Sequence, residues 1–426
     1  MGTFTLAHDP SIKFNLILIM MEKKSFFLLL VPFLLLSCSN DDSDNHTVCP
    51  PPNPINWTSS EMKLMTKNTD FGVKMFTQLC SDKANKNDNV TFSPVSMEYL
   101  LGMIANGAND GARKEMLSAM GYDDGNLSSM NSLYTKMTTL LMCSDTNMKL
   151  ALANAAWIGN DFTIRQAYRD SIGKAFNASI SNIDFANTGK AQDIINHWCE
   201  ENTNGMIKET PLVINSSLRM VLANATYFKG SWTQKFDKKN TAAADFTCAD
   251  GNTTKVNMMN RNGYIAYSAT DDYQMVVLPY GNGAFAMTLI LPKEGKDINQ
   301  IANTIDWART DTVRTNLSLY VPKFKVENLW KGFEATLQNL GINKIFTDED
   351  ALPNIASHLF ISAIAQSVCI DVNEDGTEAA AVSMGGFITS AGPEARPEVK
   401  FNRPFLFAIK EQSTGTPLFI GRISKL

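Results

Sequence analysis

The sequence has few of the residues from which enzyme active sites are built. Only four of its 426 residues are histidine: His8, His46, His197 and His358. The chain has none of the short motifs that mark zinc proteases, P-loop nucleotide-binding proteins, α/β-hydrolases or dinucleotide-binding domains. His197 falls on an amphipathic segment, where a surface residue is more common than a base, and Glu200 with Glu201 is typical of a solvated helix face. We therefore expect that the chain is not an enzyme.

The chain also has no pair of cysteines at the spacing that binds metal ions. None of its seven cysteines forms a CxxC pair, so we predict neither a metal site nor a cofactor. Cys199 and Cys369 lie in apolar patterns, which are typical of buried thiols that pack as small hydrophobic residues. In an oxidising compartment the cysteines are candidates for disulfides, and their spacing leaves the pairing open. They are Cys38, Cys49, Cys80, Cys143, Cys199, Cys248 and Cys369.

Basic residues do not cluster along the chain. The formal net charge is −5 at pH 7 and no basic run occurs, so we do not expect nucleic acid as a partner. Hydrophobic residues make up 44% and charged residues 19% of the chain, which indicates a globular protein with a sizeable core. No internal repeat is visible, and the length is compatible with one large domain.

The N-terminal segment resembles a secretory signal. A short basic flank, Glu22-Lys23-Lys24, precedes an apolar run over residues 25–36 that is too short for a membrane-spanning helix. The run ends in Leu35-Leu36-Ser37-Cys38, which resembles a bacterial lipobox and implies that a lipid is attached to Cys38. Met20 or Met21 is a candidate for the true start; alternatively, the apolar residues 16–20 lengthen the signal.

These features divide the chain into three parts. Residues 1–37 are predicted to be the signal peptide. Residues 38–57 are rich in acidic residues, other polar residues and proline, so we predict a disordered, lipid-anchored tether. Residues 58–426 are predicted to form the folded domain. On this reading the protein is anchored to a bacterial outer membrane and faces the periplasm or the cell surface.

The folded part has clear local signals. Residues Thr58-Ser59-Ser60-Glu61 form a capping-box pattern that predicts the start of a helix. Ser93 suits an N-cap and Pro94 the first position of a second helix. Apolar runs predict strands, one buried on both faces at residues 150–158, one starting just after His358, and a hairpin around residues 281–283. Helices gather early and strands later, which indicates an α+β fold.

One connection near the C-terminus is unusually long. Residues 373–391 separate the strand-like runs 367–372 and 405–409, whereas most loops have about 4–6 residues. No charged residue occurs between Glu378 and Glu394. Read with a period of two, Thr377 and the small residues that follow it fall on one face. The segment could therefore enter a sheet as a strand or remain an exposed loop, which indicates a bistable element.

Two motifs at this point resemble the serpin family. Residues 374–381, Glu-Asp-Gly-Thr-Glu-Ala-Ala-Ala, resemble the hinge of a serpin reactive-centre loop, and residues 397–407 resemble the signature that follows that loop. The resemblance covers residues 58–426. It implies an α+β serpin fold, in which helices pack around a large central β-sheet with two further sheets and an exposed reactive-centre loop.

The resemblance also implies a function. A serpin is a suicide inhibitor: a target protease cleaves the loop, forms an acyl-enzyme and is trapped when the loop inserts into the central sheet. We expect a monomer that inhibits serine proteases, with papain-like cysteine proteases as a second target class. Two alternatives stay open. One is a non-inhibitory serpin that acts as a binding protein, in which the hinge usually carries bulky, charged or proline residues. The other is a lipoprotein hydrolase of a different fold.

The resemblance assigns individual residues to three sites. Gln366 stands where many serpins have histidine, and glutamine can form hydrogen bonds but cannot titrate. Lys323 and Glu374 match an ion pair near the entry of the loop. The hinge comprises Glu374, Gly376, Thr377, Glu378, Ala379, Ala380 and Ala381. The sheet-opening cluster comprises Ser93, Ser96, Asn224, Gln366, Trp232 and Lys323.

The reactive bond follows from family spacing. Counting forward from Glu374 places it between Ser390 and Ala391, with Thr389 as the alternative first residue. Counting back from Phe401 instead gives a position beside Pro393. Small residues at the bond favour a shallow, elastase-like specificity pocket. The pair Gly385-Gly386 lies within the insertable segment and departs from the family pattern. Glycine at these positions would weaken an inserted strand.

Overall fold

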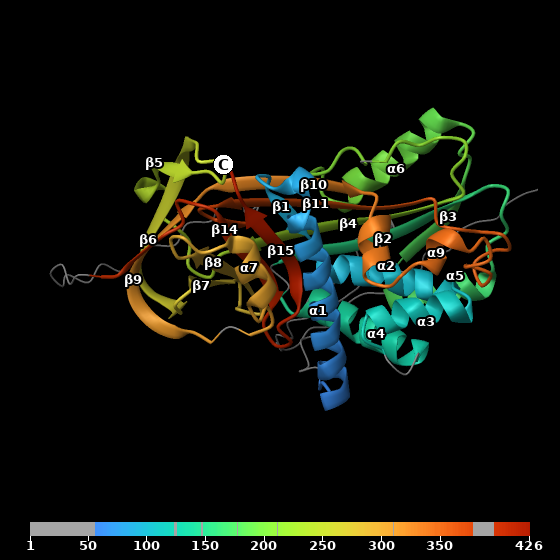
Figure 1. Ribbon diagram of the computed structural model, residues 1–426, viewed down its shortest axis with the longest axis horizontal. Helices are drawn as coiled ribbons and strands as arrows, with labels where there is room; N and C mark the ends of the chain where they lie inside the picture. Colours follow the sequence, from blue (N-terminus) through green and yellow to red (C-terminus); the bar gives the residue numbers. More distant parts are fainter. Residues whose placement is uncertain are drawn as a thin grey trace, which may run out of the picture. The chain divides into compact units, whose positions relative to one another are not determined.

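The computed structural model describes residues 56–122, 126–145, 148–176, 178–210, 212–309, 311–377 and 396–426. These residues form the expected α+β fold, with helices packed against two β-sheets of six and nine strands (Figure 1). The helices are α1 Ser59–Ser81, α2 Pro94–Gly107, α3 Asp110–Ala119, α4 Leu127–Cys143, α5 Gln166–Phe176, α6 Thr188–Asn202, α7 Ile298–Thr304, α8 Glu334–Asn339 and α9 Lys344–Thr347, with 3₁₀ turns η1 Lys83–Asn85 and η2 Lys238–Asn240.

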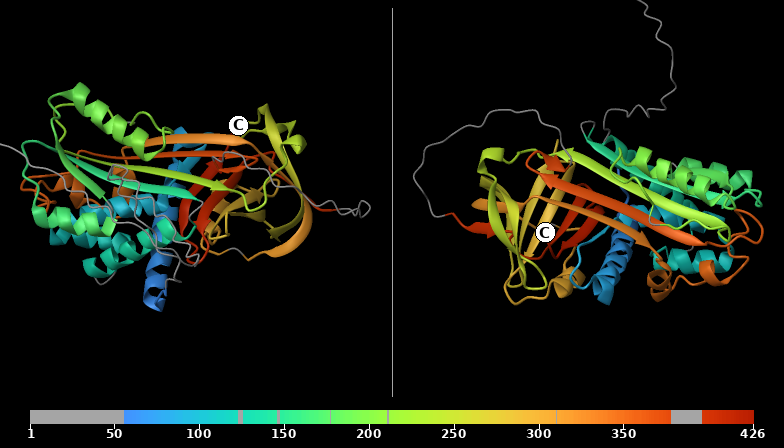
Figure 2. Two further views of the ribbon diagram at one scale, coloured as in Figure 1. Left: turned by 180° about the vertical axis from the view of Figure 1, so that it is seen from behind. Right: turned by 90° about the horizontal axis from the view of Figure 1, so that it is seen from above.

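The six-stranded sheet is the central one. Its order is β10-β11-β12-β4-β2-β3, and β11 also pairs directly with β4. Figure 2, seen from above, shows β10, β11 and β4 running side by side. The strands are β10 Phe324–Lys331, β11 Ala363–Asn373, β12 Gly376–Thr377, β4 Met220–Ser231, β2 Lys149–Gly159 and β3 Ala178–Ile183.

Successive side chains along a strand of this sheet point to opposite faces, and both faces are buried. On β4, Val221 and Ala223 join a small apolar cluster with Ile195 of α6, whereas Met220 and Leu222 join the main core. This alternation is what a strand with a helix layer on each face requires. Figure 1 shows α6 on one side of the sheet and α2 to α5 on the other.

The expected two further sheets are joined into one nine-stranded sheet. The long strand β6 pairs with β5 through its first residues, with β9 through its middle and with β7 through its last residues. The sheet order is β1-β15-β14-β8-β7-β6-β9-β13, with β5 on β6. The strands are β1 Val90–Phe92, β5 Ala242–Thr247, β6 Thr253–Ala269, β7 Tyr273–Tyr280, β8 Phe285–Pro292, β9 Val313–Pro322, β13 Glu398–Lys400, β14 Phe405–Glu411 and β15 Pro417–Ile423.

The predicted helix starts are confirmed, with one change. The backbone N–H of Glu61 donates to Thr58 Oγ1 at 3.2 Å, and the backbone N–H of Thr58 donates to the Glu61 carboxylate at 2.8 Å, which completes a capping box. Ser93 is the N-cap of α2 and Pro94 follows it, but the Ser93 side chain caps nothing. Its hydroxyl donates to the Leu418 carbonyl at 2.7 Å instead, because α2 starts deep in the core.

Two strand predictions need correction. Strand β2 was expected to be buried on both faces, but its residues 150–153 are only half-buried, since β3 pairs with it only from Asn154 onward. The strand expected just after His358 begins at Ala363 instead, and His358 lies in a turn with φ of 54°. The hairpin around residues 281–283 is confirmed, with Gly281 and Gly283 at positive φ between β7 and β8.

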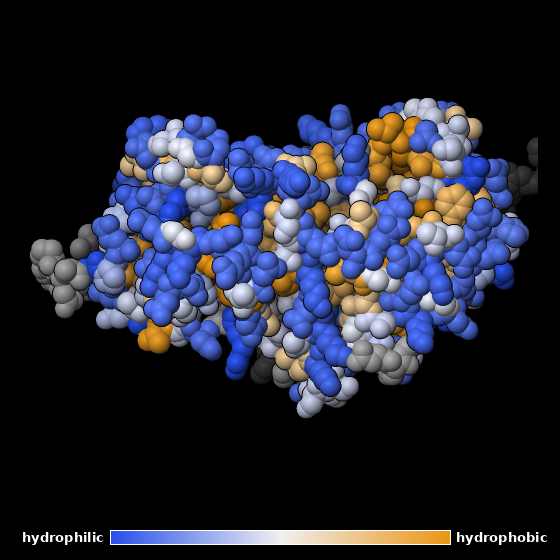
Figure 3. All heavy atoms as spheres, in the orientation of Figure 1, coloured by the Kyte–Doolittle hydropathy of each residue, from blue (hydrophilic) through white to orange (hydrophobic). Residues whose placement is uncertain are grey.

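The surface facing the viewer in Figure 3 is mostly hydrophilic, with apolar atoms gathered around α6. Ile194 on α6 and Val213 after it are among the exposed large apolar residues. In the described part of the chain, no helix combines the length and the apolar character that crossing a membrane requires.

A carboxyl group is buried in the helical layer. Glu98 of α2 is 4% exposed, and its burial raises its pKa to about 8. It lines a small cavity with Asn68 of α1 and Tyr134 of α4, and the Asn68 side-chain oxygen has no hydrogen-bond partner within the described residues. An acid in such a site is stable in its neutral form, since ionising it would leave a desolvated charge.

The variant Glu98→Gln tests this assignment. Because the folded pKa lies above the unfolded value, the stability that Glu98 contributes is complete below the unfolded pKa of about 4.5 and is lost as pH rises toward 8. We predict that the midpoint temperature of unfolding of Glu98→Gln rises relative to that of the wild type between pH 5 and pH 8. A difference between the two proteins that does not change with pH would contradict the assignment.

Candidate functional site

The central sheet contains a strand of only two residues. In β12, Gly376 pairs with Asn373 of β11 and with Ser231 of β4, and Thr377 pairs with Val372 and Gly230. Further along the sheet, β11 and β4 pair directly and in parallel, up to Val368 opposite Thr226. The sheet is thus open at one end, where β12 fills the gap, and closed below it. The hinge residues Gly376 and Thr377 therefore form part of the sheet and not of an exposed loop.

Gly376 fits where no other residue can. Its φ is 152°, and a Cβ atom at this position would lie 2.0 Å from the Gly230 carbonyl oxygen. Real non-bonded atoms do not approach so closely, so any side chain would push β12 away from β4. Glycine at this hinge position therefore permits close contact between the strands.

Thr377 is held by an aromatic pair. It is 1% exposed, and its Oγ1 lies 2.6 Å from the hydroxyl oxygen of Tyr280 at the end of β7. The Tyr280 ring stacks on Trp232, with ring centroids 4.3 Å apart. Trp232 donates from Nε1 to the Asn373 carbonyl at 2.9 Å and from its backbone N–H to the Asp375 carbonyl at 3.0 Å. These contacts of Tyr280 and Trp232 therefore hold the turn between β11 and β12 in place.

Glu374 forms an ion pair in which only its own carboxylate is buried. Its carboxylate lies 3.0 Å from Lys323 Nζ and accepts a hydrogen bond from the Thr241 hydroxyl at 2.9 Å, and its side chain is only 6% exposed. Burial opposes its ionisation, but backbone hydrogen bonds, Lys323 and Thr241 together outweigh burial and lower the pKa of Glu374. The pair expected between Lys323 and Glu374 is present, and it is more enclosed than a surface ion pair.

Asp375 is the second anchor of the turn. Its carboxylate lies 3.1 Å from Lys235 Nζ and 2.7 Å from Lys238 Nζ. Burial again opposes ionisation, but hydrogen bonds from Lys238 and Lys235 and their charges lower the pKa of Asp375. Two adjacent carboxylates thus fix the turn to the segment that follows β4.

A second polar group lies beneath the closed part of the sheet. Gln366 of β11 accepts from the Ser93 backbone N–H at 3.0 Å and donates to the Ser93 carbonyl at 3.0 Å and to the Ser96 hydroxyl at 3.2 Å. On β4, Asn224 donates to the side chain of Asn154 on β2 at 2.9 Å. Asn154, Asn224 and Gln366 are register neighbours, so amide side chains cross three strands in one row.

The six residues of the predicted sheet-opening cluster form two groups. Asn224 and Gln366 belong to the polar row and Gln366 bonds to Ser93 and Ser96, whereas Trp232 and Lys323 contact the turn between β11 and β12. Asn224 lies within β4 and Trp232 directly follows the end of that strand, so the two residues are about 26 Å apart along it. This distance explains the division into two groups. The remaining predicted residues lie outside the described residues: Glu378, Ala379, Ala380, Ala381, Thr389, Ser390, Ala391 and Cys38.

Several residues that contact the hinge or the polar row were not predicted from the sequence. Asn154 gave a signal, because it interrupts an otherwise apolar strand. Tyr280, Thr241, Lys235 and Lys238 gave none, since each meets the hinge only through the tertiary fold.

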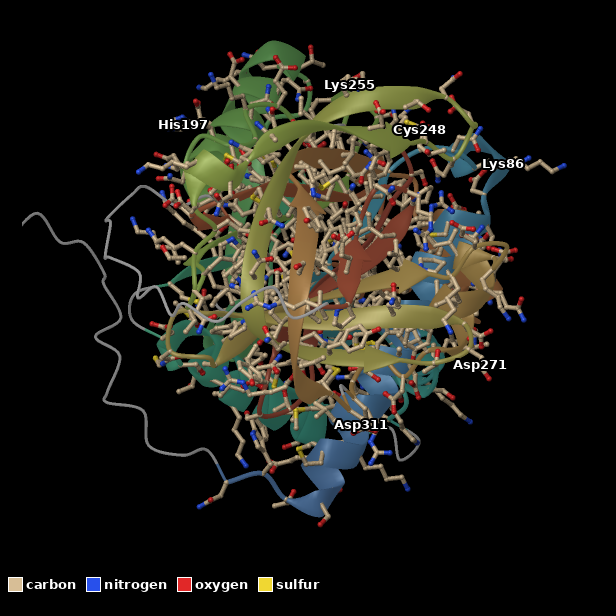
Figure 4. All side chains as sticks on the ribbon, turned by 90° about the vertical axis from the view of Figure 1, so that its left-hand side faces the viewer. Lys86, His197, Cys248, Lys255, Asp271 and Asp311 are labelled. Atoms are coloured by element: carbon tan, nitrogen blue, oxygen red, sulfur yellow. The ribbon has the colours of Figure 1, made fainter. Side chains whose placement is uncertain are left out.

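No enzyme-like constellation accompanies these groups in the described part of the chain. His197 pairs with Glu201 on α6 at 3.1 Å, with its side chain 70% exposed, and Figure 4 shows it on the outer side of the helix. His358 is exposed and pairs with Asp350. Among the described residues, no group of three or more metal-ligating side chains exists. Cys199 and Cys369 are buried among apolar neighbours, as expected.

The variant Glu374→Gln tests the ion pair with Lys323. It removes the charge that Lys323 and Thr241 stabilise, so we predict a loss of about 1–3 kcal/mol in the free energy of unfolding at pH 7. The loss should shrink in acid, because stability from a lowered pKa is lost as pH falls through the folded value. The control Asp245→Asn breaks an exposed pair with Lys255 and should cost at most about 0.5 kcal/mol. Equal losses in the two variants would contradict the account.

Comparison with known proteins identifies the fold. The family model described as "Serpin (serine protease inhibitor)" matches residues 66–426. Iripin-1 of Ixodes ricinus is 34% identical over 379 residues, which cover 85% of this chain and 95% of that protein. Neuroserpin of Homo sapiens is 28% identical over 372 residues, covering 83% of this chain and 90% of that protein.

Solved structures agree with the sequence relatives. The native state of the thermophilic serpin tengpin superposes with a TM-score of 0.78 at 28% identity, covering 89% of this chain and 97% of that chain. Native protease nexin-1 with heparin gives 0.77 at 26% identity, covering 86% and 100%. These findings exclude a hydrolase of a different fold and confirm that the chain is not an enzyme. The match over residues 66–426, together with the pairing of Gly376 and Thr377 in the central sheet, shows that this chain belongs to the serpin family of protease inhibitors.

Proposed function

We propose that the chain is an inhibitory serpin that traps serine proteases by cleavage of its loop and insertion of a strand. The proposal is favoured over a non-inhibitory binding protein by the hinge, whose residues 376–381 contain no proline and no bulky apolar side chain. Papain-like cysteine proteases form the same kind of acyl intermediate and are a second candidate class.

The register of β12 is the observation that carries the proposal. A chain that continued past Thr377 in the same two registers would place residue 381 opposite Val368 on β11 and Thr226 on β4. Val368 and Thr226 are themselves the last direct pair between these two strands. Both registers therefore agree on one insertion path, and the small residues at 379–381 would reach the closed part of the sheet first.

The chemistry follows from this path. The protease nucleophile attacks the carbonyl carbon of Ser390, the bond to Ala391 breaks, and an acyl-enzyme remains attached to Ser390. Release of the protease requires attack by water on that acyl bond. From Thr377 to Ser390 the inserted strand would span about 43 Å, which carries the attached protease along the sheet before water can act.

Insertion must break contacts across the closed sheet. The pair formed by Asn224 and Gln366 in register would be separated by a new strand, while Asn154 and Asn224 stay on the same side. The hydrogen bonds of Gln366 run to Ser93 and Ser96 and that of Asn224 runs to Asn154, so they do not join the two strands that would separate. Because Gln366 does not titrate, no pH gate is expected at this position.

The reactive bond favours proteases with a shallow pocket. Thr389, Ser390 and Ala391 are small, so we propose elastase-like serine proteases as targets and poor inhibition of trypsin-like enzymes. A basic residue that would suit trypsin, Arg396, is followed by Pro397, which hinders cleavage. It also lies beyond the length that insertion can use.

We also propose that the chain is a bacterial lipoprotein anchored through Cys38, whose tether over residues 38–57 leads into the folded domain. The support is the run Leu35-Leu36-Ser37-Cys38 after a basic flank and an apolar segment. The inhibitor would then act at a membrane surface, on proteases that reach the periplasm or the cell exterior.

Incubation with a protease tests the inhibitory function. With an elastase-like enzyme we expect a covalent complex that survives a denaturing gel, and a released C-terminal peptide that begins at Ser390 or Ala391 by mass spectrometry. Complete turnover as a plain substrate by every serine and cysteine protease tested would refute inhibition. A trypsin complex with a peptide that begins at Pro397 would refute the assigned bond.

Thr377→Arg tests insertion at the hinge. A charged side chain beneath the sheet would be desolvated without a partner, so insertion should stall and the variant should become a substrate. Thr253→Arg adds the same charge at an exposed position of β6 and should inhibit normally. Undiminished inhibition by Thr377→Arg would mean that the seating of residue 377 in the sheet does not govern insertion.

Cys38→Ser tests the anchor. We predict that the wild type fractionates with membranes and carries a lipid detectable by mass spectrometry, and that Cys38→Ser is released into the soluble fraction. A wild type that is already soluble would refute the lipobox assignment without affecting the inhibitory function.

A further inference from the structure

One side chain of the nine-stranded sheet reaches the hinge of the central sheet. Tyr280 is the last residue of β7, and its hydroxyl oxygen lies 2.6 Å from Oγ1 of Thr377. Both residues are buried, at 0% and 1% exposure. The pairings of β12 with β11 and β4 are made by backbone groups and do not use the side chain of residue 377. The Tyr280 hydroxyl is thus a contact that depends on the side chain of residue 377.

The surroundings of Tyr280 fix the position of this hydroxyl. Its ring stacks on Trp232 at 4.3 Å and meets the edge of Phe228 at 5.0 Å. Its backbone pairs with Phe285 of β8 and forms a bridge to Trp232. Because the Tyr280 ring is packed on several sides, its hydroxyl has one fixed position. The hydroxyl is therefore preorganised to bond to Thr377 when the hinge pairs with the sheet.

The hydrogen bond biases the hinge toward the sheet. If β12 left the sheet, Thr377 would bond to water, but the Tyr280 hydroxyl would be left inside an aromatic cluster. A buried hydroxyl that loses its partner costs more than an exchange with solvent, because its desolvation is no longer offset. Burial also raises the pKa of Tyr280, so its hydroxyl keeps its proton in the working pH range.

From this geometry we infer that Tyr280 is a positioning residue that holds the hinge in the sheet through the Thr377 hydroxyl and so sets how readily strand insertion begins. The inference rests on the proposed inhibitory function for its consequence, but not for the seating itself. A hinge that is already paired supplies the first residues of the new strand in register. Without the hydroxyl contact, the acyl-enzyme waits longer for insertion and more of it is hydrolysed.

Four variants separate the hydroxyl contact from packing. Tyr280→Phe keeps the stacked ring and removes the hydroxyl, Thr377→Val removes the partner hydroxyl at equal size, and the double variant removes both. Tyr168→Phe is the matched control, because it removes a buried hydroxyl that donates to the Met103 carbonyl at 3.1 Å in the helical layer, away from the hinge. Unfolding midpoints of all variants report general loss of stability.

Two measurements are made on each protein. Hydrogen exchange of the peptide that covers residues 373–377 reports seating without any protease. The number of inhibitor molecules consumed per protease trapped reports the outcome of insertion. We expect Tyr280→Phe to accelerate exchange in this peptide and to raise the consumption about two- to tenfold, the range that one net hydrogen bond spans. Tyr168→Phe should do neither, and Tyr280→Phe should have no further effect in the Thr377→Val background.

The outcomes are distinguishable. Unchanged exchange at residues 373–377 in Tyr280→Phe overturns the inference, as does an additive effect in the double variant, which would indicate packing alone. Faster exchange with unchanged consumption also overturns it, because seating would then not govern insertion. If the wild type traps no protease, the proposed function fails, while the exchange data still support or refute seating by Tyr280.

Discussion

The structure depends on a sheet that is open at one end and closed along the rest. Two residues of the hinge, Gly376 and Thr377, already separate β11 from β4, whereas below them the same strands pair directly. A strand edge with free hydrogen-bonding groups is normally covered or blocked, because it invites another strand. On the proposed function, the segment that follows Thr377 would fill this gap once the closed pairs between β4 and β11 separate.

Different groups stabilise the entry of the gap and the closed part of the sheet below it. Glu374, Asp375, Trp232 and Tyr280 fasten the start of the insertable segment by ion pairs, hydrogen bonds and stacking. Deeper in the sheet, Gln366 bonds to Ser93 and Ser96 of α2, and Asn224 of β4 bonds to Asn154 of β2. The proposed insertion requires that the start of the segment stays in place while the remainder of the sheet opens, and the attachment at the entry meets this requirement.

Much of this arrangement could be predicted from the sequence because it is encoded locally. The capping box at Thr58 and the helix that begins after Ser93 follow from short patterns, and the hinge residues 374–377 follow from the resemblance to the serpin family. Long-range contacts could not be predicted. Tyr280 meets Thr377 across 97 positions of sequence, and the Ser93 hydroxyl bonds to Leu418 rather than capping its own helix. The division of the sheet-opening residues into two groups likewise depends on strand register, which periodicity alone does not fix.

The proposed inhibitory mechanism requires that the sheet accepts one more strand once the loop is cut. The direct test is to nick the chain within residues 378–395 with a protease that it does not trap, and to compare the thermal unfolding midpoints of the intact and nicked proteins. We predict a markedly higher midpoint after the cut, because the freed segment inserts between β4 and β11 and completes the sheet. A midpoint that is unchanged or lower, as a nick in an ordinary surface loop gives, would contradict it.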